Sequence, residues 1–181
     1  MKILLNFLLA SLLVFIVFFW QPSEKSLGES PLDFQISTVN EKFFLKDLHK
    51  KQNVILYFGY TFCPDICPTT LLELSQALEN LPPEMLENLA VFFITLDPKR
   101  DAPAYLQEYA TFFHPKIAGA TADDLKKMAA AFQVKFRQNL EPPFLIDHTA
   151  DIIVIPKNAK SFTMPFGTNA AEIVQTLKEK L

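Results

Sequence analysis

The sequence predicts a mixed α/β sandwich in one domain. Three short segments rich in Val, Ile and Phe, which begin at Val54, Val91 and Ile152, are typical of buried strands. Segments with helical spacing follow the first two, and a hairpin and a last helix follow the third. Strands that alternate with helices favour a helix-covered sheet. A chain of 181 residues is long enough for one such domain with a sizeable core.

Residues 32–45 predict a β-hairpin ahead of the first buried strand. Apolar and polar residues alternate from Leu32 to Thr38, and a second short run covers Phe43–Leu45. The Lys-flanked segment that follows, with His49, is interpreted as a solvated loop. The hairpin is therefore an extension at the N-terminal side of the sandwich.

The remaining elements follow from helix and turn signals. A helix is expected from Thr69 to about Asn80, because Pro82-Pro83 stops it. His114 is interpreted as a residue at a helix C-terminus, where it favours the helix dipole. The other expected elements are a helix with Asp101 as N-cap and Pro103 in its first turn that reaches Phe112 or Phe113, a short strand at 117–119, a helix at 122–132 with Thr121 as N-cap, an edge strand at 134–136, a return strand at 161–165 and an amphipathic helix at 169–180.

The N-terminal segment predicts an uncleaved membrane anchor, and a cleaved signal peptide is the alternative. Ile3 to Trp20 is a run of eighteen residues in which only Asn6 and Ser11 are polar, which reaches the lower range for a transmembrane helix. We therefore divide the chain into an anchor (1–20), a linker (21–31) and a domain (32–181). Lys2 is the only charge before the span, which places the domain on the outer side of the cytoplasmic membrane, facing the periplasm or an equivalent space.

Charge argues against nucleic acid as a partner. The formal net charge is −3 and the isoelectric point is about 5.6. The lysines are scattered along the chain rather than gathered into a basic patch. Nucleic-acid binding is therefore not expected.

Cys63 and Cys67 are the only cysteines of the chain and mark the candidate site. They stand four apart, between the first buried strand and a helix, and a proline follows each of them. A helix N-terminus has unpaired N–H groups and a partial positive charge, so it favours a thiolate and lowers the cysteine pKa. A plain structural disulfide, or two buried thiols, is the alternative interpretation.

His148 is the candidate third member of the site. The order of the elements matches a thioredoxin-like fold, in which reactive groups gather at the carboxyl ends of the strands. In that fold the strand after His148 lies beside the strand that carries the cysteines, and Asp147-His148-Thr149 occupies the place where oxidoreductases usually have a cis-proline. Two thiolates and an imidazole suit Cu(I), and hold Cu(II) with a further donor, whereas structural zinc normally takes four protein ligands. From the residues alone, a metal ligand and a hydrogen-bonded loop histidine remain equally open.

Three blocks of the sequence resemble the SCO/SenC family of copper chaperones. They are YFGYTFCPDICPTTL, ITLDPKRDAPAYLQEYATFFHP and LIDHTADIIVI, and the resemblance spans Leu32 to Leu181. It implies an anchored thioredoxin-like protein that binds copper through Cys63, Cys67 and His148. It also implies a role in assembling the copper A centre of cytochrome c oxidase, with the copper-bearing subunit or its assembly factors as partners. Asp97 matches an acidic position of the family, but its simplest role is in forming a turn.

Four functions compete. The first is a metallochaperone that is not an enzyme and passes copper on by ligand exchange. The second is a thiol-disulfide oxidoreductase in which Cys63 attacks a partner disulfide and Cys67 resolves it, a role compatible with the first. A peroxiredoxin-like peroxidase is suggested by Thr61-x-Cys63, although the threonine of that loop normally lies one residue further from the cysteine. The last is a tethered interaction domain with a structural disulfide.

Overall fold

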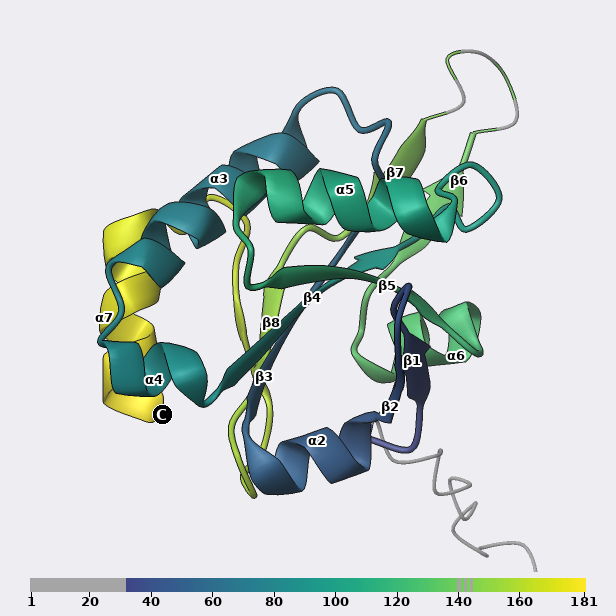
Figure 1. Cartoon of the computed structure of the whole chain (residues 1–181). Coiled ribbons are helices and arrows are strands. Elements are labelled where there is room, and N and C mark those ends of the chain that lie inside the picture. Colours follow the sequence, from purple (N-terminus) through teal and green to yellow (C-terminus); the bar gives the residue numbers. More distant parts are fainter. Residues whose placement is uncertain (1–31, 140, 142, 144) are drawn as a thin grey trace, which may run out of the picture. The chain divides into compact units, whose positions relative to one another are not determined.

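The centre of the computed structural model is a parallel pair of strands, β3 (Asn53–Gly59) and β4 (Leu89–Thr95) (Figure 1). The two strands pair along their whole length. Nearly all of their residues are buried, as expected for strands that are covered on both faces. β8 (Ile152–Ile155) runs antiparallel along the other side of β3. The three apolar segments of the sequence thus form three adjacent strands, and the strand after His148 lies beside β3 as predicted.

The structure describes residues 32–139, 141, 143 and 145–181, and seven of the strands in this part of the chain form one sheet. Its order is β2-β1-β5-β4-β3-β8-β9. The predicted N-terminal hairpin is confirmed, because β1 pairs with β2 and adds this pair to the edge of β5. A second sheet joins β6 to β7. The bounds of these strands are β1 (Gln35–Ser37), β2 (Lys42–Phe44), β5 (Ile117–Ala122), β6 (Phe136–Gln138), β7 (Ile146–His148) and β9 (Phe162–Met164).

The helices cover the sheet on both sides. α3 (Ile66–Glu79) connects β3 to β4, and α5 (Pro103–Phe113) connects β4 to β5. β3, β4 and β5 are successive neighbours in the sheet, so the chain moves the same way across it in both connections. Because such connections are right-handed, α3 and α5 lie on the same face. Figure 1 shows α3 and α5 side by side, with α7 (Ala170–Lys180) packed against α3. α2 (Leu45–Lys51) and α6 (Leu125–Ala131) lie on the other side of the sheet.

The sequence patterns did not predict two short helices. The segment around His49 is not a solvated loop but α2, which buries Leu45 and Leu48. α2 has only seven residues, too few for a clear helical period. The second, α4 (Pro83–Glu87), begins at a proline that was interpreted only as a stop signal. Proline also suits the first turn of a helix, because its missing N–H would have no partner there.

Both predicted N-caps after β4 are wrong. Ala102 occupies the N-cap position of α5, while the Asp101 carboxylate accepts hydrogen bonds from Thr61 and Thr95 instead. Thr121 belongs to β5, and Asp124 caps α6 by accepting a hydrogen bond from the Lys127 N–H. Asp101 bonds Thr95 of β4, and Thr121 pairs with Ser37 of β1. Neither residue therefore caps the helix that follows it.

The predicted anchor (1–20) and linker (21–31) lie outside the described residues. In the part of the chain that the structure does describe, no helix has the length and apolarity needed to cross a membrane. The described residues belong to one compact unit, Pro31–Leu181.

Gly119 offers a test of how tightly α5 lies on the sheet. A Cβ atom at this position of β5 would come within 2.5 Å of the Leu106 carbonyl oxygen and 2.8 Å of the Gln107 nitrogen. Both atoms belong to the backbone of α5, so they cannot move away unless the helix itself shifts. Gly119→Ala should therefore lower the free energy of unfolding by about 1–3 kcal/mol, as overpacking does.

The measurement is urea unfolding of the variant and of Ala118→Gly, a change on the same strand that creates no clash. Ala118→Gly should cost only about 0.5–1 kcal/mol, the usual backbone penalty of glycine. An equal decrease in the free energy of unfolding in the two variants would show that a Cβ atom at position 119 does not clash with α5.

Candidate metal centre

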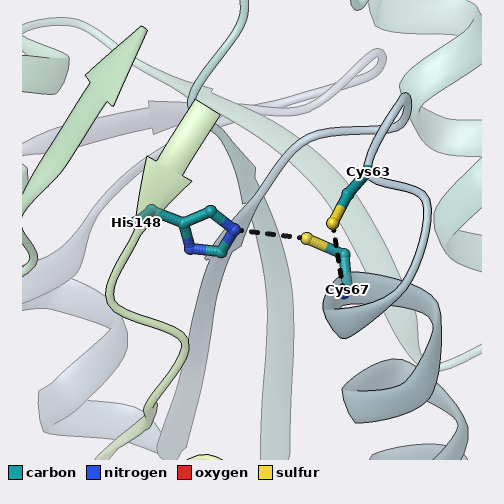
Figure 2. A group of neighbouring side chains, drawn as sticks. All are labelled: Cys63, Cys67 and His148. Atoms are coloured by element: carbon teal, nitrogen blue, oxygen red, sulfur yellow. Dashed lines mark hydrogen bonds between the residues drawn. The ribbon is translucent and has the colours of Figure 1, made fainter. Parts of the chain in front are cut away.

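Three side chains from three separate elements meet at the carboxyl end of β3. Cys63 lies in the loop after this strand, Cys67 lies in the first turn of α3, and His148 is the last residue of β7. Their ligand atoms, two sulfurs and a ring nitrogen, all lie within 4.8 Å of one another. Figure 2 shows the imidazole on one side and the two thiols on the other, pointing toward one another. The structure thus brings together all three residues that the sequence singled out.

The two thiols differ in environment and in acidity. The turn is exposed at Phe62, but both cysteine side chains are buried: Cys63 is 8% exposed and Cys67 is 0% exposed. A hydrogen bond from the Cys67 thiol lowers the pKa of Cys63 to about 3, and the backbone N–H of Cys67, at 3.4 Å from the Cys63 sulfur, contributes. The same interaction, together with burial, raises the pKa of Cys67. The reduced pair therefore carries one thiolate, at Cys63.

The orientation of His148 leaves one ring nitrogen available toward the sulfurs. Nδ1 lies 2.9 Å from the carbonyl oxygen of Thr149, which only accepts hydrogen bonds, so we assign the proton to Nδ1. Nε2 then carries a lone pair, and it lies 3.4 Å from the Cys67 sulfur. Metal-binding histidines are commonly oriented in this way by a carbonyl on the other nitrogen. His148 is not a loop residue, because it ends β7 and pairs there with Phe136 of β6.

Tyr60 connects the cysteine loop to His148, and sequence reasoning did not single it out. Its ring meets the imidazole edge-on with 6.0 Å between the centroids. Its hydroxyl accepts a hydrogen bond from the Ile146 N–H at 3.2 Å, at the start of β7. This partner lies far away in sequence, so no local pattern could have revealed the contact.

Asp97 and Asp101 lie beside the site but are not part of the three-residue group. Asp97 forms the predicted turn, since its carbonyl oxygen accepts hydrogen bonds from the N–H groups of Arg100 and Asp101, and its carboxylate pairs with Arg100. The Thr61 hydroxyl is turned to Asp101, at 2.5 Å. A hydroxyl engaged in this way does not act as the threonine of a peroxidatic loop, so this contact disfavours the peroxidase interpretation.

The other two histidines do not approach the site. His49 is half-buried on α2, and its Nδ1 is buried. His114 is the C-cap residue that follows α5, and its Nδ1 accepts a hydrogen bond from the Lys116 N–H. Burial lowers the pKa of His114, which weakens its predicted role as a cation at the helix end.

The fold and the site together define a thioredoxin-like protein with two thiols and an imidazole at the carboxyl end of its central strand. The chain belongs to the SCO1/SenC family, whose sequence profile matches residues 24–181. The family expected from the three sequence blocks is therefore confirmed.

Known proteins agree with this assignment. The SCO2-like protein RC0895 of Rickettsia conorii is 37% identical over 134 residues, which cover 71% of this chain and 65% of the relative, slightly less than two thirds of its length. The solution structure of apo Sco1 from Thermus thermophilus superposes with a TM-score of 0.73 and 32% identity, over 84% of this chain and 92% of that chain. Yeast Sco1 with copper bound superposes with a TM-score of 0.71 and 31% identity, over 81% and 85% of the two chains.

The pKa difference between the two thiols predicts how the reduced protein reacts with iodoacetamide. A free thiol has a pKa near 8.5, so its thiolate fraction falls about tenfold per pH unit below that value. Because the pKa of Cys63 lies at about 3, its alkylation rate should change little between about pH 8 and pH 5. Mass spectrometry of the alkylated peptide at each pH gives this rate.

Cys67→Ala supplies the control, because it removes the thiol that donates to Cys63. The pKa of Cys63 should then rise and its alkylation should slow at low pH. An alkylation rate of wild-type Cys63 that already falls about tenfold per pH unit would contradict the thiolate assignment.

Proposed function

We propose that this chain is a copper chaperone, which holds copper through Cys63, Cys67 and His148 and passes it to a partner protein. The observation that carries the proposal is the convergence of the three donor atoms within 4.8 Å. Two thiolates and an imidazole form a soft donor set that suits Cu(I), and Cu(II) with one further ligand. The copper-bound structure of yeast Sco1, a similar protein, supports the choice of metal.

Copper is the cargo in this proposal, so the site must both hold and release it. Cys67 is fully buried in the first turn of α3, whereas Cys63 lies in the loop and is slightly exposed. A partner thiolate therefore reaches copper most easily from the side of Cys63. Ligand exchange then replaces one chaperone sulfur at a time, and no free metal ion is needed.

The recipient we propose is the copper-bearing subunit of cytochrome c oxidase, reached directly or through its assembly factors. Membership of the SCO1/SenC family supports this recipient. In this proposal residues 1–20 anchor the domain in the cytoplasmic membrane, and the domain faces the periplasm or an equivalent space. Such a compartment allows the dithiol to be oxidised as well as metallated.

A thiol-disulfide oxidoreductase is the second candidate, and the low pKa of Cys63 favours it. A thiolate attacks disulfides, and the neighbouring buried thiol of Cys67 is placed to resolve the mixed disulfide. Reduction of the recipient's cysteines before copper loading would use the same two residues. The two candidates differ in their need for His148, which thiol-disulfide exchange does not require.

His148→Ala separates these candidates. The variant loses one copper ligand but keeps the dithiol, so we expect the affinity of the reduced protein for Cu(I) to fall by a factor of at least about 10. Its ability to cycle between dithiol and disulfide should remain. Competition with a chromophoric Cu(I) chelator measures the affinity, and thiol titration after oxidation and re-reduction measures the cycle.

Oxidised wild-type protein is the control, because a Cys63–Cys67 disulfide removes both thiolates and should abolish Cu(I) binding. If His148→Ala binds copper like the wild type and still cycles between dithiol and disulfide, the chaperone proposal fails and the oxidoreductase takes its place.

The anchor is tested by following the full chain after expression in a bacterial host. We expect it in the membrane fraction with Met1 to Trp20 still attached, because the apolar run is long enough to span the hydrocarbon core. N-terminal sequencing reads the mature start. A start between Trp20 and Leu32 would mean that the segment is a cleaved signal instead.

A further inference from the structure

Asp101 is a fully buried carboxylate with no role in the donor set. Its exposed fraction is 0%, and it lies in the turn between β4 and α5. Burying a carboxylate is costly unless hydrogen bonds replace its hydration. Three donors do so: the Thr61 hydroxyl at 2.5 Å and the Thr61 N–H at 3.1 Å, and the Thr95 hydroxyl at 2.6 Å. Hydrogen bonds to a charged acceptor of this kind are short and strong.

Two of these three donors come from Thr61, which lies two residues before Cys63. Oδ1 binds the Thr61 side chain and Oδ2 binds its backbone N–H, so the carboxylate holds this residue at two points. Thr95 is the last residue of β4 and belongs to the rigid centre of the sheet. The carboxylate thus ties the start of the cysteine loop to the sheet.

Cys63 is the donor that most needs such support. Cys67 is held by the backbone of α3, and His148 is held by β7 and by its hydrogen bond to Thr149. Cys63 belongs to no helix or strand. Its N–H donates to the Tyr60 carbonyl oxygen at 3.2 Å, so its position depends on where the Tyr60–Thr61 segment is held.

We infer that Asp101 is a positioning residue of the metal site, which sets the distance of the Cys63 sulfur from Cys67 and His148 through its bonds to Thr61. This inference rests on the proposed function, because it concerns how copper is held. Asp101 does not contact the metal in this scheme. It acts through Thr61 on the one ligand that lies in a loop.

The test uses two variants that break the connection and two that keep it. Asp101→Ala removes every acceptor, and Thr61→Val removes the hydroxyl at nearly constant volume. Asp101→Asn keeps an acceptor oxygen at the same place, and Thr61→Ser keeps the hydroxyl. Ser75→Ala is a matched control, because it deletes another buried hydroxyl, which bonds the Phe113 carbonyl oxygen at 2.6 Å between α3 and α5.

Three quantities are measured on the full chain: the Cu(I) affinity by chelator competition, the visible absorption of the Cu(II) form and the thermal midpoint of the metal-free protein. We expect Asp101→Ala and Thr61→Val to weaken Cu(I) binding by roughly 10-fold to 100-fold, the usual effect of losing a residue that orients a ligand. Both should also shift the absorption. Asp101→Asn and Thr61→Ser should recover most of the affinity, while Ser75→Ala should lower only the thermal midpoint.

The outcomes are distinguishable. If Asp101→Ala and Thr61→Val lower the thermal midpoint but bind copper with wild-type affinity and absorption, the carboxylate is only structural and the inference is wrong. If Asp101→Ala does not fold, the comparison of Thr61→Val with Thr61→Ser decides. If the wild-type protein itself does not bind Cu(I), the proposed function fails, and the inference fails with it.

Discussion

The geometry of the site depends on a close contact between Cys67 and the backbone of Gly59. A Cβ atom at Gly59 would come within 2.8 Å of the Cys67 sulfur and 2.7 Å of the Phe93 ring. Only glycine therefore allows the first turn of α3 to lie against the end of β3. This approach places the buried sulfur at the carboxyl end of the central strand, and the other two donors gather around it.

The sequence predicted what depends on local patterns. Runs of Val, Ile and Phe are long enough in β3, β4 and β8 to identify buried strands, and their order defined the sandwich. The last helix was also predicted, from its amphipathic pattern, and the structure adds a capping box formed by Asn169 and Glu172 at its start. Both cysteines lie in one short segment, so their proximity needed no tertiary information.

Long-range contacts could not be predicted in the same way. Asp101 has the residue type and the position of a helix cap, but the hydroxyl and amide of Thr61 in the cysteine loop and the hydroxyl of Thr95 in β4 provide stronger partners for its carboxylate. Nothing in the sequence near Tyr60 indicates that its hydroxyl accepts a hydrogen bond at the start of β7. His148 remained open between ligand and loop residue, because its orientation comes from the carbonyl oxygen of Thr149 and from the ring of Tyr60.

The three donors are supported to different degrees, and this difference bears on release as well as binding. A helix holds Cys67 and a strand holds His148, so neither can move without disturbing regular structure. Cys63 lies in a loop that is held mainly through its neighbours, and it is also the more exposed of the two thiols. It carries the thiolate in the reduced pair, which makes it the first sulfur to meet an incoming metal ion or a partner disulfide. In the proposed copper chaperone, all three donors would therefore hold the metal, and ligand exchange would begin at Cys63, the donor that lies in a loop.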